Sequence, residues 1–432
     1  MRSMKDSGVE WIGEIPEYWN LRKLSHLLTS IGSGTTPKNK VDYYKGDISW
    51  LNTGDLNDGQ ISQIKKTVSE LAVKDYSALK IYPENSVVIA MYGATIGKLG
   101  IITSPTTTNQ ACCVMTCGTE LIPLYLYYSL FGMRPYILTL AYGAGQPNIS
   151  ANTIRFLPIL LPSLNEQTRI ASFLDKKCAA IDSAIKNQRA SIDKLKEYRQ
   201  AVITEAVTKG LNPDVPMKDS GVEWIGEIPE KWDVTKVSML YNVILGKMLS
   251  NNPSDEFDSL ENYLCAANLK WDGIRIDEVK RMWFSETEKS RYLLTKGDIV
   301  VTEGGDIGVS SEYLGEASPC YIQNAVHKVT AKDKSASNKL FYYWMCAVKN
   351  SGYLDLICNK ATIAHYTKEK LSTTPVLAIP IKEQTEIAAY LDKKCSVIDK
   401  TVSGKEKLIE KLEEYKKSLI YEAVTGKIEV PT

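Results

Sequence analysis

The 432-residue sequence is long enough for two or three domains, and 44% hydrophobic with 24% charged residues is an ordinary globular composition. No apolar run approaches the ~20 residues that span a bilayer, and no signal-peptide core is present, so we expect an intracellular, cytoplasmic protein. The net charge is +1, with +4 over residues 22–160 and −1 over residues 233–380. Such weak charge excludes a chain that binds nucleic acid tightly through phosphate contacts alone. The nine cysteines are scattered through apolar stretches, and we expect reduced, buried thiols.

The first element is an aromatic segment that occurs twice. Residues 4–19 read MKDSGVEWIGEIPEYW and residues 217–232 read MKDSGVEWIGEIPEKW, so fifteen of sixteen positions are identical. We name these two segments the straps. Their tryptophans and isoleucines surround Gly and Pro turn formers, which predicts an irregular segment packed over an apolar surface rather than a ligand-binding motif.

The first strap leads into a globular region over residues 20–160. Short apolar runs separated by Gly, Asn, Pro and Thr clusters predict strands at 86–92, 98–103 and 111–116. Short helices are expected at 123–131 and 149–157, followed by an extended apolar run, PILLP. This mixture predicts an α/β class with a mixed sheet.

A long amphipathic helix follows over residues 166–208, which at ~1.5 Å per residue would measure roughly 65 Å. Its apolar residues repeat every 3.5 positions, as in a coiled coil, and only Gln188 and Arg199 interrupt the seam. The seam residues are Ala171, Leu174, Cys178, Ile181, Ile185, Ile192, Leu195 and Val202.

The second half of the chain repeats this plan with lower identity over residues 233–380. NSVVIAMYGATIGKLG (85–100) aligns without gaps with KGDIVVTEGGDIGVSS (296–311), and TNQACCVMT (108–116) aligns with IQNAVHKVT (322–330). A second long helix is predicted over residues 383–425, with Lys405 and Lys416 interrupting the seam at the same two steps. Its seam residues are Ala388, Leu391, Cys395, Ile398, Val402, Ile409, Leu412 and Leu419.

The duplication predicts two related α/β (mixed) globular domains separated by two long coiled-coil helices that pack antiparallel with pseudo-twofold symmetry. The expected boundaries are 1–160 for the first strap and domain, 161–210 for the central helix, 211–378 for the second strap and domain, and 379–432 for the C-terminal helix.

Motifs for chemistry are weak throughout. GATIGK (93–98) lacks the spacing of a phosphate-binding loop and predicts a turn between strands. No G-x-G-x-x-G opens a helix after a strand, and no N-P-P-Y or D-P-P-Y stretch occurs. The three histidines are far apart, and Cys112, Cys113 and Cys117 have no second Cys/His pair at zinc-ligand spacing. We therefore expect no catalytic residue, metal site or cofactor in this chain.

Two related but divergent domains suit a bipartite target that is read by polar loop side chains. The candidates in the first domain are Ser33, Thr35, Thr36, Lys38, Asn52, Thr53, Asp55, Tyr92, Thr95, Lys98, Asn109, Gln110, Gln146 and Asn148. The candidates in the second are Lys247, Asn268, Lys270, Glu303, Asp306, Gln323, Asn324, His327, Lys360 and His365.

The straps, GATIGK with TTNQ, GAGQPNISANTIRFLPILLP and the two EQTxIAxxLDKKC helix starts together resemble the specificity (S) subunit of type I restriction-modification systems. The resemblance covers nearly the whole chain. It implies two target-recognition domains, each reading one half of an interrupted double-stranded DNA sequence, and two helices that set the spacer. It also implies two methyltransferase (M) subunits docked on the helices and nuclease-translocase (R) subunits as further partners, which would hold S-adenosyl-methionine, ATP and Mg. The second domain reads GDIGV where the first reads TIGK, which leaves its base contacts open.

The resemblance makes the helix seam a surface for register setting or subunit docking. Its candidates are Leu174, Cys178, Ile181, Ile185, Gln188, Arg199, Leu391, Cys395, Ile398, Val402, Lys405 and Lys416. Two rival hypotheses remain open: a stand-alone bipartite DNA-binding regulator or scaffold, and a self-sufficient nuclease or methyltransferase.

Overall fold

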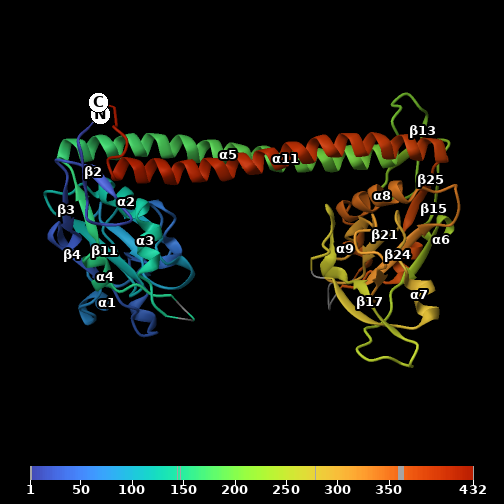
Figure 1. Ribbon diagram of the computed structural model, residues 1–432, viewed down its shortest axis with the longest axis horizontal. Helices are drawn as coiled ribbons and strands as arrows, with labels where there is room; N and C mark the ends of the chain where they lie inside the picture. The colour runs from blue at the N-terminus through green and yellow to red at the C-terminus, as the bar shows by residue number, and fades with distance from the viewer. Residues whose placement is uncertain (1, 144, 146, 278, 359–363, 432) are drawn as a thin grey trace. The chain divides into compact units, whose positions relative to one another are not determined.

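The computed structural model describes residues 2–431 except 144, 146, 278 and 359–363 (Figure 1). The chain forms two compact units, the first comprising Met1–Gln188 with Glu406–Thr432 and the second Arg189–Lys405. Each unit contains one strap, one globular domain and part of each long helix.

The first unit is built on a five-stranded sheet in the order β4-β11-β8-β9-β6, in which only β6 and β9 pair in parallel. A smaller sheet, β10-β5-β7, pairs β5 with β10 in parallel. The strands are β1 (Met4–Asp6), β2 (Glu14–Pro16), β3 (Asn20–Lys23), β4 (Leu28–Ser33), β5 (Ile48–Leu51), β6 (Gly59–Ile61), β7 (Thr67–Val68), β8 (Val87–Ala90), β9 (Leu99–Ile102), β10 (Thr107–Thr108), β11 (Cys112–Cys117) and β12 (Pro158–Leu161).

The helices of this unit confirm the expected pattern. They are α1 (Glu70–Asp75), α2 (Pro123–Gly132), α3 (Arg134–Thr139), α4 (Ala151–Arg155) and the first part of α5 (Leu164–Lys209), with 3-10 turns at Leu24–His26, Val41–Tyr43, Thr53–Asp55 and Gly93–Thr95. The helix α2 is apolar on nearly all sides because it lies between the sheet and the two long helices (Figure 1). GATIGK forms the predicted turn, between β8 and β9.

The second unit follows the same plan, with a four-stranded sheet β16-β24-β21-β22 and a three-stranded sheet β20-β17-β23. Its strands are β13 (Met217–Asp219), β14 (Glu227–Pro229), β15 (Asp233–Lys236), β16 (Tyr241–Leu245), β17 (Ser259–Leu264), β18 (Leu269–Lys270), β19 (Gly273–Ile274), β20 (Lys280–Phe284), β21 (Ile299–Thr302), β22 (Ser310–Glu312), β23 (Tyr321–Ile322), β24 (Val326–Ala331) and β25 (Pro375–Ala378). Its helices are α6 (Val237–Leu240), α7 (Glu286–Tyr292), α8 (Asn338–Asn350), α9 (Tyr353–Ile357), α10 (Lys368–Thr373) and the first part of α11 (Ile381–Val424), with a 3-10 turn at Ala266–Asn268.

The pairings of the two units correspond strand by strand, which confirms the internal duplication. The order β4-β11-β8-β9 matches β16-β24-β21-β22, and the parallel pair β5–β10 matches β17–β23. The pair β3–β12, which leads into α5, matches β15–β25, which leads into α11. The fold class is therefore the predicted mixed α/β, with two related domains and two long helices.

The straps pack their apolar side chains into the protein as predicted, but each contains a short β-hairpin and is not wholly irregular. Ile12, Ile15 and Trp19 of the first strap are buried, and so are Ile225, Ile228 and Trp232 of the second. Each strap folds into a small hairpin, β1–β2 or β13–β14, whose last tryptophan lies against the start of a long helix.

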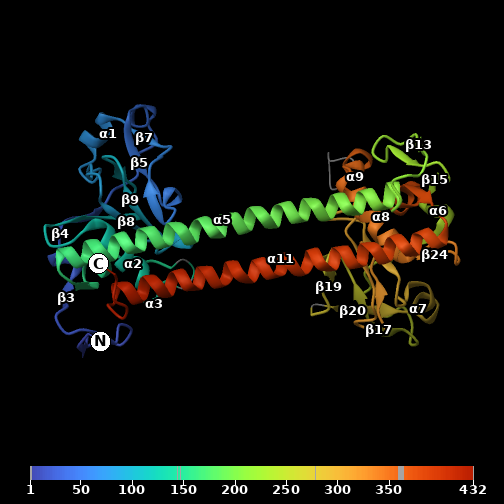
Figure 2. The same cartoon turned by 90° about the horizontal axis from the view of Figure 1, so that it is seen from above.

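The long helices run antiparallel in each unit, where they lie side by side (Figure 2). In the first unit, Arg169 near the start of α5 contacts the carbonyl of Val430, whereas Asp182, further along, pairs with Lys416. In the second unit Arg199 pairs with Asp399, and Val202 and Glu205 further along lie beside Tyr390. Most of the predicted seam residues are buried, and Leu195, Val402 and Leu412 are half-buried.

All nine cysteines are free thiols, and seven of them are buried, as expected from the sequence. Burial raises the pKa of Cys112, Cys113 and Cys117 to about 12, so these thiols on β11 stay protonated at neutral pH. Within the described part of the chain, no helix has the length and apolar character that crossing a membrane requires.

Candidate nucleic-acid interface

Polar loops of the first unit meet at one edge of its sheets, where β4, β5 and β10 end. There the Thr36 hydroxyl donates to Gln110 Oε1 at 2.7 Å, and Asn109 Nδ2 donates to Asn52 Oδ1 at 3.1 Å. The Trp50 indole, buried beneath, donates to the carbonyl of Thr35 at 3.2 Å. Side chains that are distant in sequence thus form one hydrogen-bonded surface, which we name the first polar edge.

The loop after β8 joins this edge through backbone hydrogen bonds. Met91 N donates to the carbonyl of Ala111 at 2.8 Å, and Ile149 N donates to that of Met91 at 2.9 Å. These bonds bring Tyr92 and Asn148 next to the Asn109 loop. The Thr95 hydroxyl donates to the Tyr92 carbonyl, and Lys98 lies exposed where β9 begins.

The remaining candidates of this unit differ in what their side chains do. Asp55 is committed to its own turn, since Oδ2 accepts from Asn52 N at 2.9 Å. Ser33 ends β4 half-buried, Thr53 opens the 3-10 turn, and Lys38 lies exposed with its backbone N–H on the Tyr76 hydroxyl. Gln146 lies outside the described residues.

The second unit contains an equivalent edge, and glycines define the equivalence. A Cβ at Gly34 would overlap the carbonyl of Thr108, and a Cβ at Gly246 would overlap that of Ile322, the residue aligned with Thr108. Only glycine allows so close an approach of two backbones. The following residues, Thr35 and Lys247, therefore occupy the same position in the two units.

Two neighbouring amides confirm the equivalence. Asn109 Oδ1 accepts from Ala111 N at 3.1 Å, and Gln323 Oε1 accepts from Ala325 N at 3.3 Å. In both units the side chain of the first amide residue, Asn109 or Gln323, holds the loop in place. The next residue, Gln110 or Asn324, lies at the polar edge. The predicted alignment of these segments is confirmed.

The gapless alignment of 85–100 with 296–311 is wrong by one residue at the strand. Glu303 N donates to the Ala325 carbonyl and Tyr366 N donates to that of Glu303, which are the bonds that Met91 makes in the first unit. Glu303 therefore corresponds to Met91, and Gly304 rather than Glu303 corresponds to Tyr92. The turn of the second unit is one residue shorter, which a gapless alignment cannot represent.

The second polar edge thus gathers Lys247, Glu303, Gln323, Asn324 and His365. His365 follows β21 in space as Asn148 follows β8, and its ring lies close to Gly304. Burial raises the pKa of Glu303, and the nearby His365 opposes that shift. A carboxylate, a glycine and an imidazole, from Glu303, Gly304 and His365, stand where the first edge has Met91, Tyr92 and Asn148.

Lys247 adds little positive charge to the second polar edge, because its ammonium group is bound inside the domain. Its ammonium donates to the Trp283 carbonyl at 2.8 Å, pairs with Glu288 at 2.5 Å and lies over the ring of Phe284. Although burial acts to raise the pKa of Glu288, hydrogen bonds from Lys247 and Ser285 lower it below the ordinary value. The ammonium is thereby neutralised within the domain.

Two candidates lie inside the domain and are not retained as base contacts. His327 is fully buried on β24, its Nε2 is 2.8 Å from the Tyr366 carbonyl, and burial lowers its pKa to about 4. Asn268 is also buried, where its side chain bonds Cys265 N and the Arg275 carbonyl, both at 2.9 Å. Neither can meet a base without unfolding of its strand or turn.

Asp306 and Lys270 lie on other elements, the turn after β21 and the strand β18. Asp306 is exposed on the turn after β21 and pairs with Lys349 at 2.6 Å. Lys270 is exposed on β18, and its carbonyl accepts from Ser311. Lys360 lies outside the described residues.

Exposed apolar side chains at both edges were missed from the sequence. Tyr142 pairs with Asn148 across a short backbone bridge and is 57% exposed. Met248 and Leu249 follow Lys247 directly and are also largely exposed. Their signal in the sequence was apolar residues inside otherwise polar loops, and such groups suit contacts with thymine methyl groups.

The seam candidates divide into two kinds. Leu174, Cys178, Ile181, Ile185, Leu391, Cys395 and Ile398 are buried, and Val402 is half-buried. Arg199 pairs with Asp399 at 2.9 Å and Lys416 with Asp182 at 2.7 Å, so these interruptions form equivalent ion pairs across the two helices. Gln188 and Lys405 are half-buried. The paired residues favour a role in helix register.

Known proteins share both the sequence pattern and the fold. The family model described as the type I restriction modification DNA specificity domain matches residues 16–192 and again 229–414. The MjaIX type I restriction enzyme specificity subunit of Methanocaldococcus jannaschii is 29% identical over 256 residues, which cover 57% of this chain and 56% of that protein. The putative MjaX specificity subunit of the same organism is 25% identical over 437 residues, which cover 98% and 96%.

Solved structures resemble the fold over nearly the whole chain. A chain from work on complex assembly and conformational transition of the type I R-M system has a TM-score of 0.74 at 15% identity, and the match covers 96% of this chain and 99% of that one. The HsdS subunit from Thermoanaerobacter tengcongensis has a TM-score of 0.54 at 14% identity, with 96% and 98% covered.

Proposed function

Because this chain belongs to the family of type I restriction-modification DNA specificity proteins, we propose that it reads a bipartite DNA target, one half-site for each polar edge. Two family-model matches, one on each domain, make it a DNA sequence-recognition subunit with a non-catalytic role. We further propose that the two polar edges contact the bases and that their different side chains select different half-sites.

The observation that supports this proposal most strongly is that the two polar edges share the same backbone conformation but present different side chains. Gly34 and Gly246 fix equivalent loops, yet the next residues are Thr35 and Lys247. Amides and hydroxyls dominate the first edge, and the second adds a carboxylate and an imidazole. Because base edges are distinguished by their donors and acceptors, different groups on one frame select different bases.

We propose that partner subunits carry out the chemistry. Two methyltransferase subunits would bind S-adenosyl-methionine and modify the target, and nuclease-translocase subunits would use ATP and Mg. Support comes from the family and from the complex described for the similar structure. We expect the protein to act in the cytoplasm on chromosomal DNA.

The helix pair is the proposed spacer ruler. The seam and the two equivalent ion pairs, Arg199–Asp399 and Asp182–Lys416, resist sliding of one helix along the other. A fixed register would translate into a fixed number of base pairs between the half-sites.

Methylome sequencing tests the proposal directly. A host expressing this chain with its methyltransferase partner should gain methylation at one interrupted motif, which a host without the chain lacks. Exchanging Thr35, Thr36 and Gln110 for the residues of the second edge should change one half-site alone. Methylation that persists without the chain, or a swap that alters both half-sites, would contradict the proposal.

Binding by the chain alone separates the proposal from a stand-alone regulator. With a net charge of +1, the isolated chain should bind the target weakly, and adding the methyltransferase should tighten binding more than tenfold at ~0.15 M salt. Equal footprints with and without the partner would favour the regulator.

A further inference from the structure

Each strap ends in a tryptophan that is bound to a glutamate at the start of a long helix. In the first unit Trp19 Nε1 donates to Glu166 Oε2 at 3.2 Å, and in the second Trp232 Nε1 donates to Glu383 Oε2 at 3.0 Å. The two sites are equivalent in sequence and in hydrogen bonding. The side chain that binds Glu166 in the first site therefore indicates which kind of group can bind Glu383 in the second.

In the first unit an arginine fills the site. Arg2 Nη1 lies 3.1 Å from Glu166 Oε1, and its side chain is only 17% exposed. The hydroxyl of Tyr18 donates to the same oxygen at 3.2 Å. Arg2 also lies 3.7 Å from Glu429, so the guanidinium stands between two carboxylates.

The second unit lacks these groups. Arg2 stands two residues before the first strap, and Val215 occupies that position before the second; Lys231 replaces Tyr18. Glu386 stands where the first unit has Arg169, whose guanidinium donates to the Val430 carbonyl at 2.7 Å. The second site therefore has no counterpart of the arginines Arg2 and Arg169 and has the carboxylate of Glu386 in place of Arg169.

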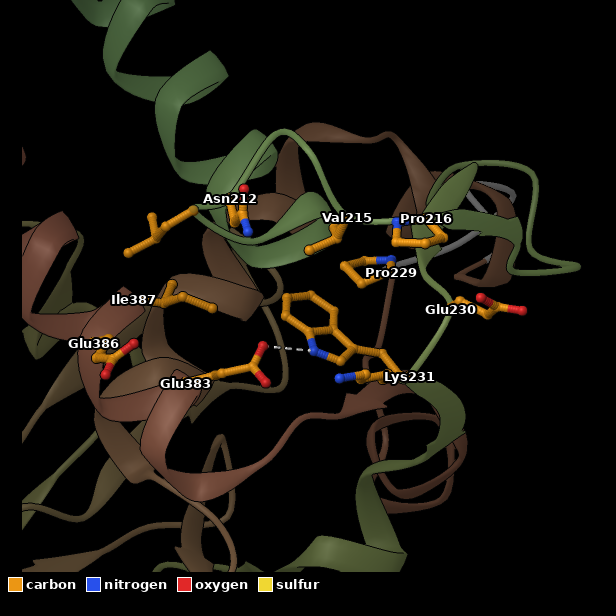
Figure 3. Close-up of a pocket in the computed structure, with 11 residues that line it drawn as sticks. Asn212, Val215, Pro216, Pro229, Glu230, Lys231, Glu383, Glu386 and Ile387 are labelled. Atoms are coloured by element: carbon orange, nitrogen blue, oxygen red, sulfur yellow. Dashed lines mark hydrogen bonds between the residues drawn. The ribbon is translucent and has the colours of Figure 1, made fainter.

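A cavity of about 340 Å³ opens at this place (Figure 3). Its apolar wall includes Val215, Pro216, Pro229 and Ile387, together with Trp232. Glu383, Glu386 and Glu230 also line it, against the single ammonium of Lys231. Trp232 Nε1 donates to Oε2 of Glu383. Oε1 of Glu383 can therefore accept from a guanidinium, as Oε1 of Glu166 does from Arg2 in the first unit.

We propose that this cavity binds an arginine side chain presented by a methyltransferase subunit of the restriction-modification complex. The apolar wall suits the methylene stem, and the carboxylates suit the planar guanidinium better than a compact ammonium. In the first unit the arginine arrives on a peptide segment beside the strap, and a partner segment would arrive in the same way. The identity of the complex rests on the proposed function, whereas the chemistry of the cavity does not.

A first experiment fills the cavity from within. Val215→Arg supplies the arginine in cis, at the position where the first unit has it. Assembly of this variant with the cognate methyltransferase subunits should weaken at least tenfold, and so should assembly of Glu383→Gln, which keeps an acceptor for Trp232. Val215→Ala is the matched control and should assemble like the wild type. Thermal melting shows that each variant is folded.

Wild-type assembly by Val215→Arg would overturn the inference. That result is distinct from failure of the proposed function, in which the wild-type chain itself would direct no methylation of an interrupted motif.

A second experiment tests the chemistry on the full chain alone. The peptide acetyl-Gly-Arg-Gly-amide should shift the Trp232 indole NMR resonance, assigned with Trp232→Phe, with a dissociation constant on the order of millimolar. The citrulline peptide, which has the same shape without the charge, should bind at least tenfold more weakly, and so should the arginine peptide to Glu383→Gln. Equal shifts from both peptides, or no saturable shift, would contradict an arginine site.

Discussion

At the scale of single residues, buried glutamines fix the entry to each long helix. Gln167 accepts from Ile122 N at 2.9 Å and donates to the carbonyls of Glu120 and Pro162 at 2.9 and 3.0 Å. Gln384 makes the equivalent bonds to Ser337 N and to the carbonyls of Ser335 and Ile379. Both side chains are essentially inaccessible to solvent, so each ties a loop of its domain to its helix.

Removing this amide should be costly. Gln167→Ala leaves one buried N–H and two carbonyls without partners, and we expect the free energy of unfolding to fall by about 3 kcal/mol. Chemical denaturation followed by circular dichroism measures the change. Gln63→Ala, at an exposed loop position, is the control and should change stability by less than ~0.5 kcal/mol. A Gln167→Ala variant as stable as the control would contradict the role of the amide.

The pair between Lys247 and Glu288 makes stability depend on pH. The folded pKa of Glu288 is lowered, so its contribution is present above the unfolded pKa of ~4.3 and is lost as pH falls through the folded value. The melting temperature of the wild type should therefore exceed that of Glu288→Gln at pH 7, and the difference should shrink towards pH 3. Glu286→Gln, which removes a more exposed pair with Lys289, should show a smaller dependence. A difference that grows on acidification would contradict the assignment.

At the scale of elements, the spacing of apolar residues predicted the helices and strands whose formation depends on burying those residues. The long helices begin and end within two residues of the predicted bounds, because a 3.5-residue seam of apolar side chains specifies a helix packed on a helix. The strands 86–92, 98–103 and 111–116 correspond to β8, β9 and β11 for the same reason: each is a continuous apolar run buried in the sheet.

The loops were less predictable because their side chains choose among partners distant in sequence. Lys247 turns into its domain to meet Glu288, a contact that no local pattern indicates. His327 lies in a polar-looking stretch but alternates into the core of its sheet, where Cys113 lies in the first unit. Composition therefore indicated which loops are polar, whereas the orientation of each side chain required the fold.

Within α11, Gly404 offers a test of helix propensity. It is exposed, and a Cβ added there would meet nothing within 4 Å. Gly404→Ala should raise the free energy of unfolding by about 1 kcal/mol, because alanine restricts the unfolded chain and favours the helix. Gly8→Ala, at an equally open site with φ +71°, should instead destabilise the protein. Measuring both by thermal denaturation separates backbone strain from crowding, and equal signs would contradict this account.

At the scale of the whole molecule, the repeat of the helix seam sets what length changes are tolerated. Deleting seven residues between 185 and 200 of α5, together with the facing seven of α11, keeps both seams in phase. Each helix would shorten by ~10.5 Å, so we expect the spacer to lose about three base pairs while both half-sites stay the same. Methylome sequencing of the variant gives both values, and altered half-site bases would contradict the ruler. Deleting two residues from each helix is the control, since two residues turn a helix by about 200°, which puts the seams out of phase and should abolish assembly.

The backbone contacts at Gly34 and Gly246 have a consequence for how such a protein changes over generations. Each glycine is demanded by a carbonyl of the neighbouring strand, so the position of the adjacent residue is set by the scaffold and not by that residue's own side chain. If Thr35 and Thr36 contact bases as proposed, substitution at either residue can explore new base preferences without first disturbing the fold. A codon library at these two positions should retain folding in most members while recognition diversifies, so a new target would be one or two mutational steps away.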